Sequence, residues 1–154
     1  MYANIVVGTD LSETAAKAVD QAAALAKAFG AKLHIVTGFK TAMASNLPAS
    51  TLEAMAYGVA AELLHEAESK IGDGVRSTLE GLAKRYESDG VAVQTYGCGA
   101  EPADALLEVA ETTNADLIVV GNRGMSGVKR FVLGSVPNKV AHHASCSVLI
   151  VHTT

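Results

Sequence analysis

Residues 4–36 read NIVVGTDLSETAAKAVDQAAALAKAFGAKLHIV, and two apolar runs in this stretch flank a helix pattern. The runs Ile5 to Val7 and Leu33 to Val36 are short and rich in β-branched residues, which is typical of buried strands. Between them, apolar residues recur at spacings of three and four, and Ser12 and Gly30 are residue types that begin and end helices. The stretch therefore predicts a strand, a helix and a second strand.

Three more segments have strand patterns. Leu117 to Val120 and Val148 to Val151 are again short apolar runs, while Val91 to Tyr96 alternates between apolar and polar residues. Residues 40–58 follow neither a strand nor a helix pattern and are predicted to form a long loop or lid that could cover a site. Five strands are therefore expected.

Helix patterns fill most of the remaining chain. Residues 59–88 are helical in pattern, with a break predicted near Gly72 to Gly74 because glycine weakens helix interiors. Pro102 suits the first turn of the next helix, where its missing N–H costs nothing. Ser135 is predicted to cap the last helix, which runs to about His143.

Alternating strands and helices predict an α/β fold with an open, doubly wound parallel sheet, formed as a single domain over residues 1–154. The strand pattern allows two orders, 2-1-3-4-5 and 3-2-1-4-5. Ligands bind at the carboxyl ends of the strands of such sheets, where the strand order reverses. Both orders place Asp10 at that crevice.

Composition and charge exclude several classes of function. The net charge is −4 and the chain has no run of Lys and Arg, so it lacks the basic face that nucleic-acid binding needs. It also lacks a signal-peptide pattern and an apolar run long enough to span a membrane, which favours a cytoplasmic protein. Cys98 and Cys146 have no metal-ligand spacing and are expected to be free thiols.

The most informative motif is a glycine-rich segment between a predicted strand and a helix. It consists of Gly121, Gly124 and, nine residues later, Gly134 and Ser135. Glycine lets backbone N–H groups approach an anion without a Cβ in the way, and the following helix adds N–H donors and a partial positive charge. No Lys follows the glycines as in a P-loop, and GxGxxG is absent after the first strand. The segment therefore predicts a phosphate site of another kind.

The spacing Gly121-x2-Gly124-x9-Gly134-Ser135 resembles the signature of the ATP-binding branch of the universal stress proteins. Residues 5–13, IVVGTDLSE, resemble the first strand and turn of that family, and residues 148–151, VLIV, resemble its closing strand. The likeness also covers the predicted third helix and is weak over residues 40–88. It implies a Rossmann-like fold, similar to the adenine nucleotide alpha hydrolases, with strand order 3-2-1-4-5.

The resemblance also implies the residues of a nucleotide site. Gly121 to Val136 would surround the ribose and phosphates, while Asp10 and the end of the second strand would hold the adenine side. The full set of implied residues is Gly8, Thr9, Asp10, Gly38, Val120, Gly121, Arg123, Gly124, Ser126, Gly134, Ser135 and Val136. Gly38 stands where relatives usually carry valine, so a wider base pocket is expected.

Several of these residues also have structural interpretations. Asp10 could simply cap the first helix, and Thr9 could be a turn residue. Arg123, with Lys129 and Arg130, could form a solvated basic face rather than attract phosphate. The five histidines have no triad or metal-ligand spacing and are predicted to be structural, so no catalytic or metal-binding residue is assigned.

The expected function is binding of ATP, or of a related adenine nucleotide such as ADP, in a regulatory stress-response protein. Two alternatives stay open: a module that binds AMP or cyclic AMP (cAMP), and an enzyme that hydrolyses ATP slowly with Mg²⁺. A phosphoacceptor receiver domain is disfavoured because only Asp10 is present of its acidic cluster. The resemblance and edge-strand chemistry further predict a homodimer through Ser147 to His152.

Overall fold

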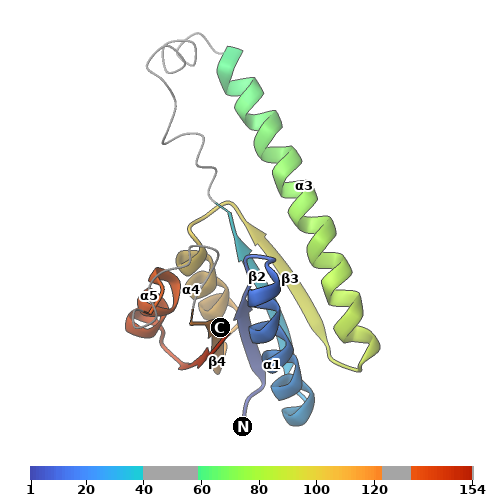
Figure 1. The fold of residues 1–154 in the computed structure, drawn as a ribbon, viewed down its shortest axis with the longest axis vertical. Coiled ribbons are helices and arrows are strands. Elements are labelled where there is room, and N and C mark those ends of the chain that lie inside the picture. The colour runs from blue at the N-terminus through green and yellow to red at the C-terminus, as the bar shows by residue number, and fades with distance from the viewer. Residues whose placement is uncertain (40–58, 123–132, 154) are drawn as a thin grey trace.

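The computed structural model describes residues 1–39, 59–122 and 133–153, and its centre is a five-stranded parallel sheet (Figure 1). The strand order is β3-β2-β1-β4-β5, so the order 3-2-1-4-5 is confirmed. The strands are β1 (Asn4–Gly8), β2 (Lys32–Gly38), β3 (Val93–Cys98), β4 (Leu117–Gly121) and β5 (Ser147–Val151). The helices are α1 (Glu13–Phe29), α3 (Val59–Ser88), α4 (Pro102–Thr112) and α5 (Ser135–His143).

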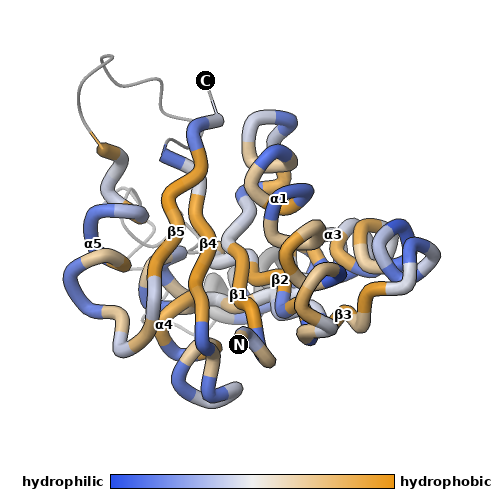
Figure 2. Tube along the Cα trace, turned by 90° about the horizontal axis from the view of Figure 1, so that it is seen from below, coloured by the Kyte–Doolittle hydropathy of each residue, from blue (hydrophilic) through white to orange (hydrophobic). Residues whose placement is uncertain are grey.

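Helices cover both faces of the sheet. Figure 2 shows α1 and α3 on one side and α4 and α5 on the other. Because side chains alternate along a strand, Ile5 and Val7 enter the core beside α1, whereas Val6 enters the core beside α4. All three are fully buried. This two-sided burial explains why the central strands read as continuous apolar runs.

Both predicted ends of α1 are confirmed. The Ser12 hydroxyl accepts a hydrogen bond from the N–H of Ala15 at 3.1 Å, which satisfies a donor that the helix itself leaves unpaired. At the other end Gly30 adopts a left-handed φ of 65°, and its N–H donates to the carbonyl of Ala26. The sequence signals at both positions act locally, so they are readable without the tertiary structure.

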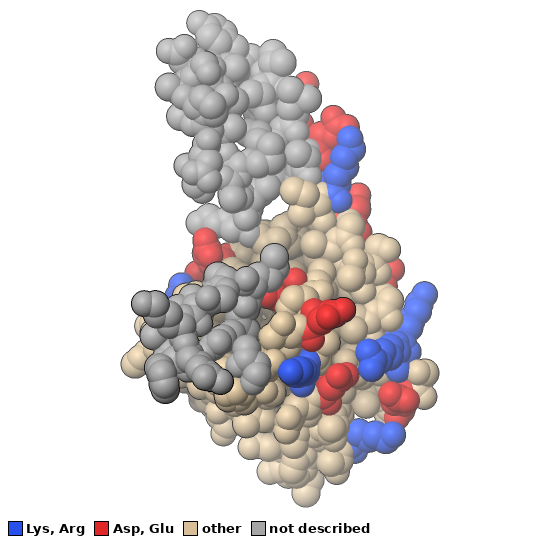
Figure 3. Space-filling view, viewed as in Figure 1, with Lys and Arg blue, Asp and Glu red and all other residues tan. Residues whose placement is uncertain are grey.

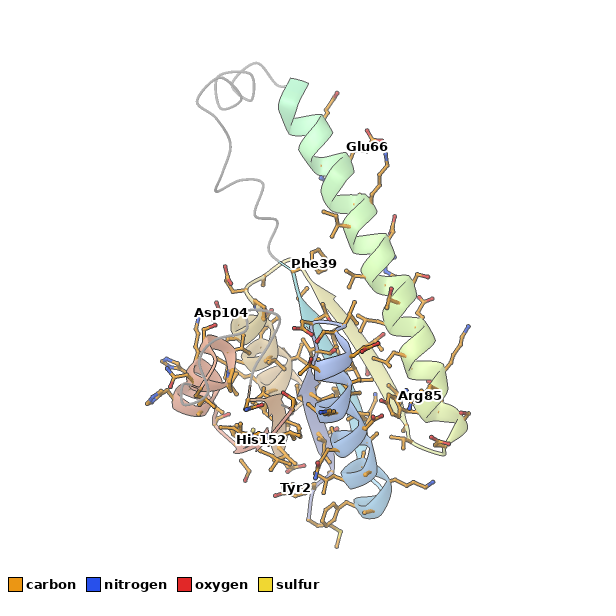
Figure 4. The ribbon with its side chains drawn as sticks, viewed as in Figure 1. Tyr2, Phe39, Glu66, Arg85, Asp104 and His152 are labelled. Atoms are coloured by element: carbon orange, nitrogen blue, oxygen red, sulfur yellow. The ribbon has the colours of Figure 1, made fainter. Side chains whose placement is uncertain are left out.

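The predicted break near Gly72 and Gly74 is wrong, because α3 runs as one helix of 30 residues. Phe39 lies beside one of these glycines: a Cβ on Gly72 would lie 3.7 Å from its Cζ, an ordinary packing distance, and Figure 4 shows Phe39 where β2 ends beside α3. Farther along the helix, Leu79 and Tyr86 are buried against the sheet. Their burial offsets the weak helix propensity of glycine, about 1 kcal/mol per residue.

The start of α5 also differs from the prediction. Gly134, not Ser135, is the N-cap, and it has extended backbone angles with no side-chain hydrogen bond. The carbonyl of Gly134 accepts from the N–H of Asn138, while its own N–H donates to the carbonyl of Asn122. This link to the end of β4 fixes the cap one residue earlier, so Ser135 becomes the first helical residue. The predicted loop or lid at residues 40–58 lies outside the described residues.

Candidate nucleotide-binding site

A cavity of about 310 Å³ lies at the carboxyl ends of β1, β2 and β4, beside the first turns of α4 and α5. Gly8, Gly38 and Gly121 are the last residues of these three strands. This is the position at which open parallel sheets bind ligands. The cavity is lined by Gly8, Thr9, Asp10, Ala15, Val36, Gly38, Pro102, Leu106, Val120, Gly121, Gly134, Ser135, Val136 and Pro137.

The fold thus brings most of the predicted residues together. They come from three separate stretches of the chain: the end of β1, the end of β2, and the end of β4 together with the start of α5. The exceptions are Arg123, Gly124 and Ser126, which lie outside the described residues, as do Lys129 and Arg130. Every predicted site residue that the structure describes therefore lines this one cavity.

Asp10 does not cap α1, so that structural interpretation is wrong. Its Oδ1 accepts a hydrogen bond from the N–H of Ser12 at 3.0 Å, and Ser12 is the residue that caps the helix. The intervening Leu11 has a left-handed φ of 64°, which is uncommon for a residue with a branched side chain. Asp10 is exposed and lines the cavity.

The N–H, the carbonyl and the hydroxyl of Thr9 each make a hydrogen bond. Its N–H donates to the carbonyl of Val36 at 2.9 Å, and its carbonyl accepts from the hydroxyl of Thr37 at 2.8 Å. Its own hydroxyl accepts from the N–H of Leu11 at 3.0 Å. These contacts hold the turn after β1 against the end of β2, as the turn interpretation requires, and leave Thr9 on the cavity wall.

The expectation of a wider pocket at Gly38 is wrong. A Cβ built on Gly38 would lie 2.5 Å from the Cα of Pro102 and 3.0 Å from the carbonyl oxygen of Ala100. The main chain that enters α4 already fills the volume that a side chain would take. Gly38 therefore allows a close backbone approach rather than enlarging the cavity.

The opposite rim is built from the end of β4 and the start of α5. Gly121 and Gly134 both line it, and the backbone N–H groups of Ser135 and Val136 follow in the first turn of α5. That first turn carries no acidic residue, so the positive end of the helix dipole is not neutralised there. Backbone donors and a positive helix end are the groups that bind phosphate elsewhere. This rim therefore has the groups that a phosphate would need.

Comparison with known proteins agrees with this geometry. Residues 1–152 match the model of the universal stress protein family. The universal stress protein Rv1636 of Mycobacterium tuberculosis is 37% identical over 158 residues, covering 99% of this chain and 98% of the relative. The chain belongs to the universal stress protein family.

Two solved structures extend the comparison. A universal stress protein crystallised in complex with cAMP is 32% identical, with a TM-score of 0.68 and coverage of 99% of this chain and 98% of its own. The protein MJ0577 has a TM-score of 0.77 at 23% identity and covers 99% of this chain and 96% of its own. The second supports the fold alone, while the first is a relative with an adenine nucleotide bound.

One residue of this universal stress protein was missed by sequence reasoning. Asn122 follows β4 directly, and its Oδ1 accepts from both the N–H and the hydroxyl of Thr153, each at 2.9 Å. Its backbone N–H donates to Val151, and its carbonyl accepts from Gly134. The position between Gly121 and Arg123 was a weak signal, but nothing in the pattern indicates a partner 31 residues away.

Few reactive side chains lie on the described wall of the cavity. Asp10 is the sole ionisable side chain among the described lining residues. No group of three His, Cys, Asp or Glu side chains in the described parts of the chain could hold a metal ion. Cys98 and Cys146 are free thiols, and burial raises the pKa of each. Neither thiol lines this cavity.

Charged side chains of both signs share the surface of the described residues (Figure 3). Figure 3 shows acidic and basic side chains interspersed on one face, without a broad basic patch among the described residues. Lys139 lies on α5, and its Nζ is paired with Asp104 Oδ1 of α4 at 2.6 Å. None of the helices described here has the length and apolar character needed to span a membrane.

Proposed function

We propose that this universal stress protein binds an adenine nucleotide, with ATP as its ligand, in the cavity between β1, β4 and α5. The observation that carries the proposal is the convergence of Asp10, Gly38, Gly121 and Gly134 on one cavity. A volume of about 310 Å³ lies at the lower end of the usual range for small-molecule sites, about 300–1,000 Å³. The base would lie near Asp10 and Gly38, and the phosphates at the α5 rim.

A module for cAMP or AMP is the second candidate, and a specific observation favours it. The relative at 32% identity was crystallised with cAMP, and its chain is covered almost completely. Backbone N–H groups at a helix N-terminus can bind a nucleotide with one phosphate as readily as a nucleotide with three phosphates. Thermal melts with cAMP, AMP, ADP and ATP would therefore compare these ligands directly.

The role that fits this cavity is regulatory rather than catalytic. Binding to the folded state stabilises it, and a nucleotide that prefers one conformation shifts the population toward that conformation. Fast ATP hydrolysis needs a group that positions water, and Asp10 is the one carboxylate on the described wall. Mg²⁺ is commonly held by one or two carboxylates together with phosphates, so Asp10 would hold it beside bound ATP. Any hydrolysis would be slow.

A homodimer through β5 is the second part of the proposal. The strand order leaves β5 at one edge of the sheet, where its outer backbone groups have no neighbour among the described strands. Ile150 is 38% exposed on that strand. Pairing with β5 of a second copy about a two-fold axis would satisfy the backbone groups of both strands and cover the apolar edge.

Mass spectrometry of the purified protein tests the ligand. Nucleotide released from denatured protein identifies what the cavity carries, and thermal melts with added ATP, ADP, AMP and cAMP rank the ligands. The proposal expects an adenine nucleotide to raise the melting temperature, because the ligand binds only the folded state. Melts that stay unchanged with all four nucleotides would remove the support for nucleotide binding.

A further inference from the structure

Asn122 joins three segments that are far apart along the chain. It follows β4, its N–H donates to Val151 at the end of β5, and its carbonyl accepts from Gly134, the N-cap of α5, at 3.1 Å. Its side chain accepts two hydrogen bonds from Thr153. Asn122 therefore fixes the distance between the end of β4 and the start of α5. These two segments form the rim of the cavity that is proposed to bind phosphate.

Thr153 holds the Asn122 side chain from a buried position. Thr153 is only 1% exposed, so its hydroxyl has no access to water as an alternative partner. The Thr153 carbonyl accepts from Lys17 Nζ at 2.9 Å, which ties it to α1. A buried hydroxyl with one acceptor has little freedom to move, and the same constraint applies to Asn122 Oδ1.

We propose that Asn122 and Thr153 form a positioning pair that sets the place of the α5 N-terminus and so the affinity of the cavity for phosphate groups. The inference rests on the proposed nucleotide function. Gly134 is bonded to Asn122, and Ser135 and Val136 follow it on the cavity wall. A shift of Asn122 therefore moves the N–H donors of the first turn, whose attraction for an anion falls with distance.

The hydrogen bonds between Asn122 and Thr153 are predicted to affect binding of the phosphate groups of the nucleotide rather than binding of its base. The adenine side is built from Asp10 and Gly38, and Asn122 does not line that wall. Removing a hydrogen bond between Asn122 and Thr153 is expected to weaken binding of AMP and ATP. The affinity for adenosine, which has no phosphate, should stay nearly unchanged. A purely structural role would weaken adenosine and nucleotides alike.

Calorimetric titration of Thr153→Val and Asn122→Ala tests the pair. Thr153→Val keeps the volume and removes one hydroxyl donor, so AMP affinity is expected to fall about fivefold, as for one lost hydrogen bond. Asn122→Ala should lose about tenfold or more. Thr113→Val is the matched control, because it removes the hydroxyl bond to Val109 at the carboxyl end of α4, and neither of these residues lines the cavity.

Amide exchange of Gly134 supplies a readout that needs no nucleotide. Its N–H should lose protection in Thr153→Val and Asn122→Ala but not in Thr113→Val. If the parent protein binds no nucleotide yet Gly134 loses protection, the proposed function fails and the positioning of α5 stands. Unchanged exchange protection of the Gly134 N–H in Thr153→Val and Asn122→Ala would contradict the proposed positioning role. Equal losses of affinity for AMP and adenosine would contradict it as well.

Discussion

The Cα of Pro102 lies 2.5 Å from the point that a Cβ on Gly38 would occupy. This contact joins the end of β2 to the first residue of α4, on the wall of the candidate site. It gives a packing reason for glycine at this position. The close approach also predicts that this position tolerates no side chain.

Gly38→Ala is expected to destabilise the fold by about 1–3 kcal/mol, since a backbone atom must move to admit the methyl group. Gly99→Ala is the control, because a Cβ at Gly99 meets nothing within 4 Å. That change should alter stability by about 0.5 kcal/mol or less. Denaturant unfolding of both variants gives the comparison, and equal stabilities would show that Pro102 does not restrict Gly38.

Asp10→Ala should weaken nucleotide binding more than it weakens the fold. The variant loses the exposed hydrogen bond to Ser12, a kind of bond worth about 0.5–1.5 kcal/mol, but also the one carboxylate on the described cavity wall. Ser12→Ala is the matched control, since it removes the α1 cap at about 1 kcal/mol without touching the cavity. Thermal melts with and without ATP separate the two: equal ATP shifts in both variants would assign Asp10 a structural role.

Local signals account for the parts of the fold that were predicted correctly. Ser12, Gly30 and Pro102 act within a few residues of their own position, so their effects on α1 and α4 are readable from the sequence. The apolar runs gave the strands for the same reason. The family resemblance, rather than periodicity, selected between the two strand orders.

The errors arose where distant residues decide the local structure. The continuity of α3 past Gly72 is supported by Leu79 and Tyr86, which pack against the sheet farther along the helix, and the cap of α5 depends on Asn122. Gly38 was interpreted as an enlarged pocket because Pro102 is far along the chain. The three-dimensional contacts of glycines were therefore the least readable part of the candidate site.

Stability is expected to fall as the pH drops below about 6.5, because of His34. Burial, with the nearby charge of Lys32, lowers the pKa of His34 below its ordinary value of 6.5, and its ring nitrogens lie 3.2 Å from Asn4 Oδ1 and Tyr96 OH. The unfolded chain therefore binds the proton more tightly, so stability is full above pH 6.5 and is lost below it.

Melting temperatures measured between about pH 7 and pH 5.5 test this, above the range where most carboxylates titrate. His34→Gln should remove this part of the pH dependence, while His65→Gln, an exposed position on α3, should keep it. A parent protein with a flat profile over this range would contradict the assignment to His34.

Ile150→Lys is expected to convert a β5-paired dimer into monomers, since a charged edge residue prevents strand pairing. Ile71→Lys is a close control, because Ile71 is 40% exposed on α3 and Ile150 is 38% exposed on β5. Light scattering over a dilution series measures both. A monomeric parent protein at micromolar concentration, or loss of the dimer in both variants, would rule out pairing through β5.

The central claim is that phosphate binds at the start of α5, and titration of Ser135→Asp with ATP tests it most directly. The first turn of α5 has no acidic residue, so an aspartate there should maintain or raise stability by about 0.3–1 kcal/mol. The same carboxylate would repel phosphate, and we expect ATP affinity to fall about tenfold while the melting temperature does not fall. An unchanged ATP affinity in Ser135→Asp would contradict the claim.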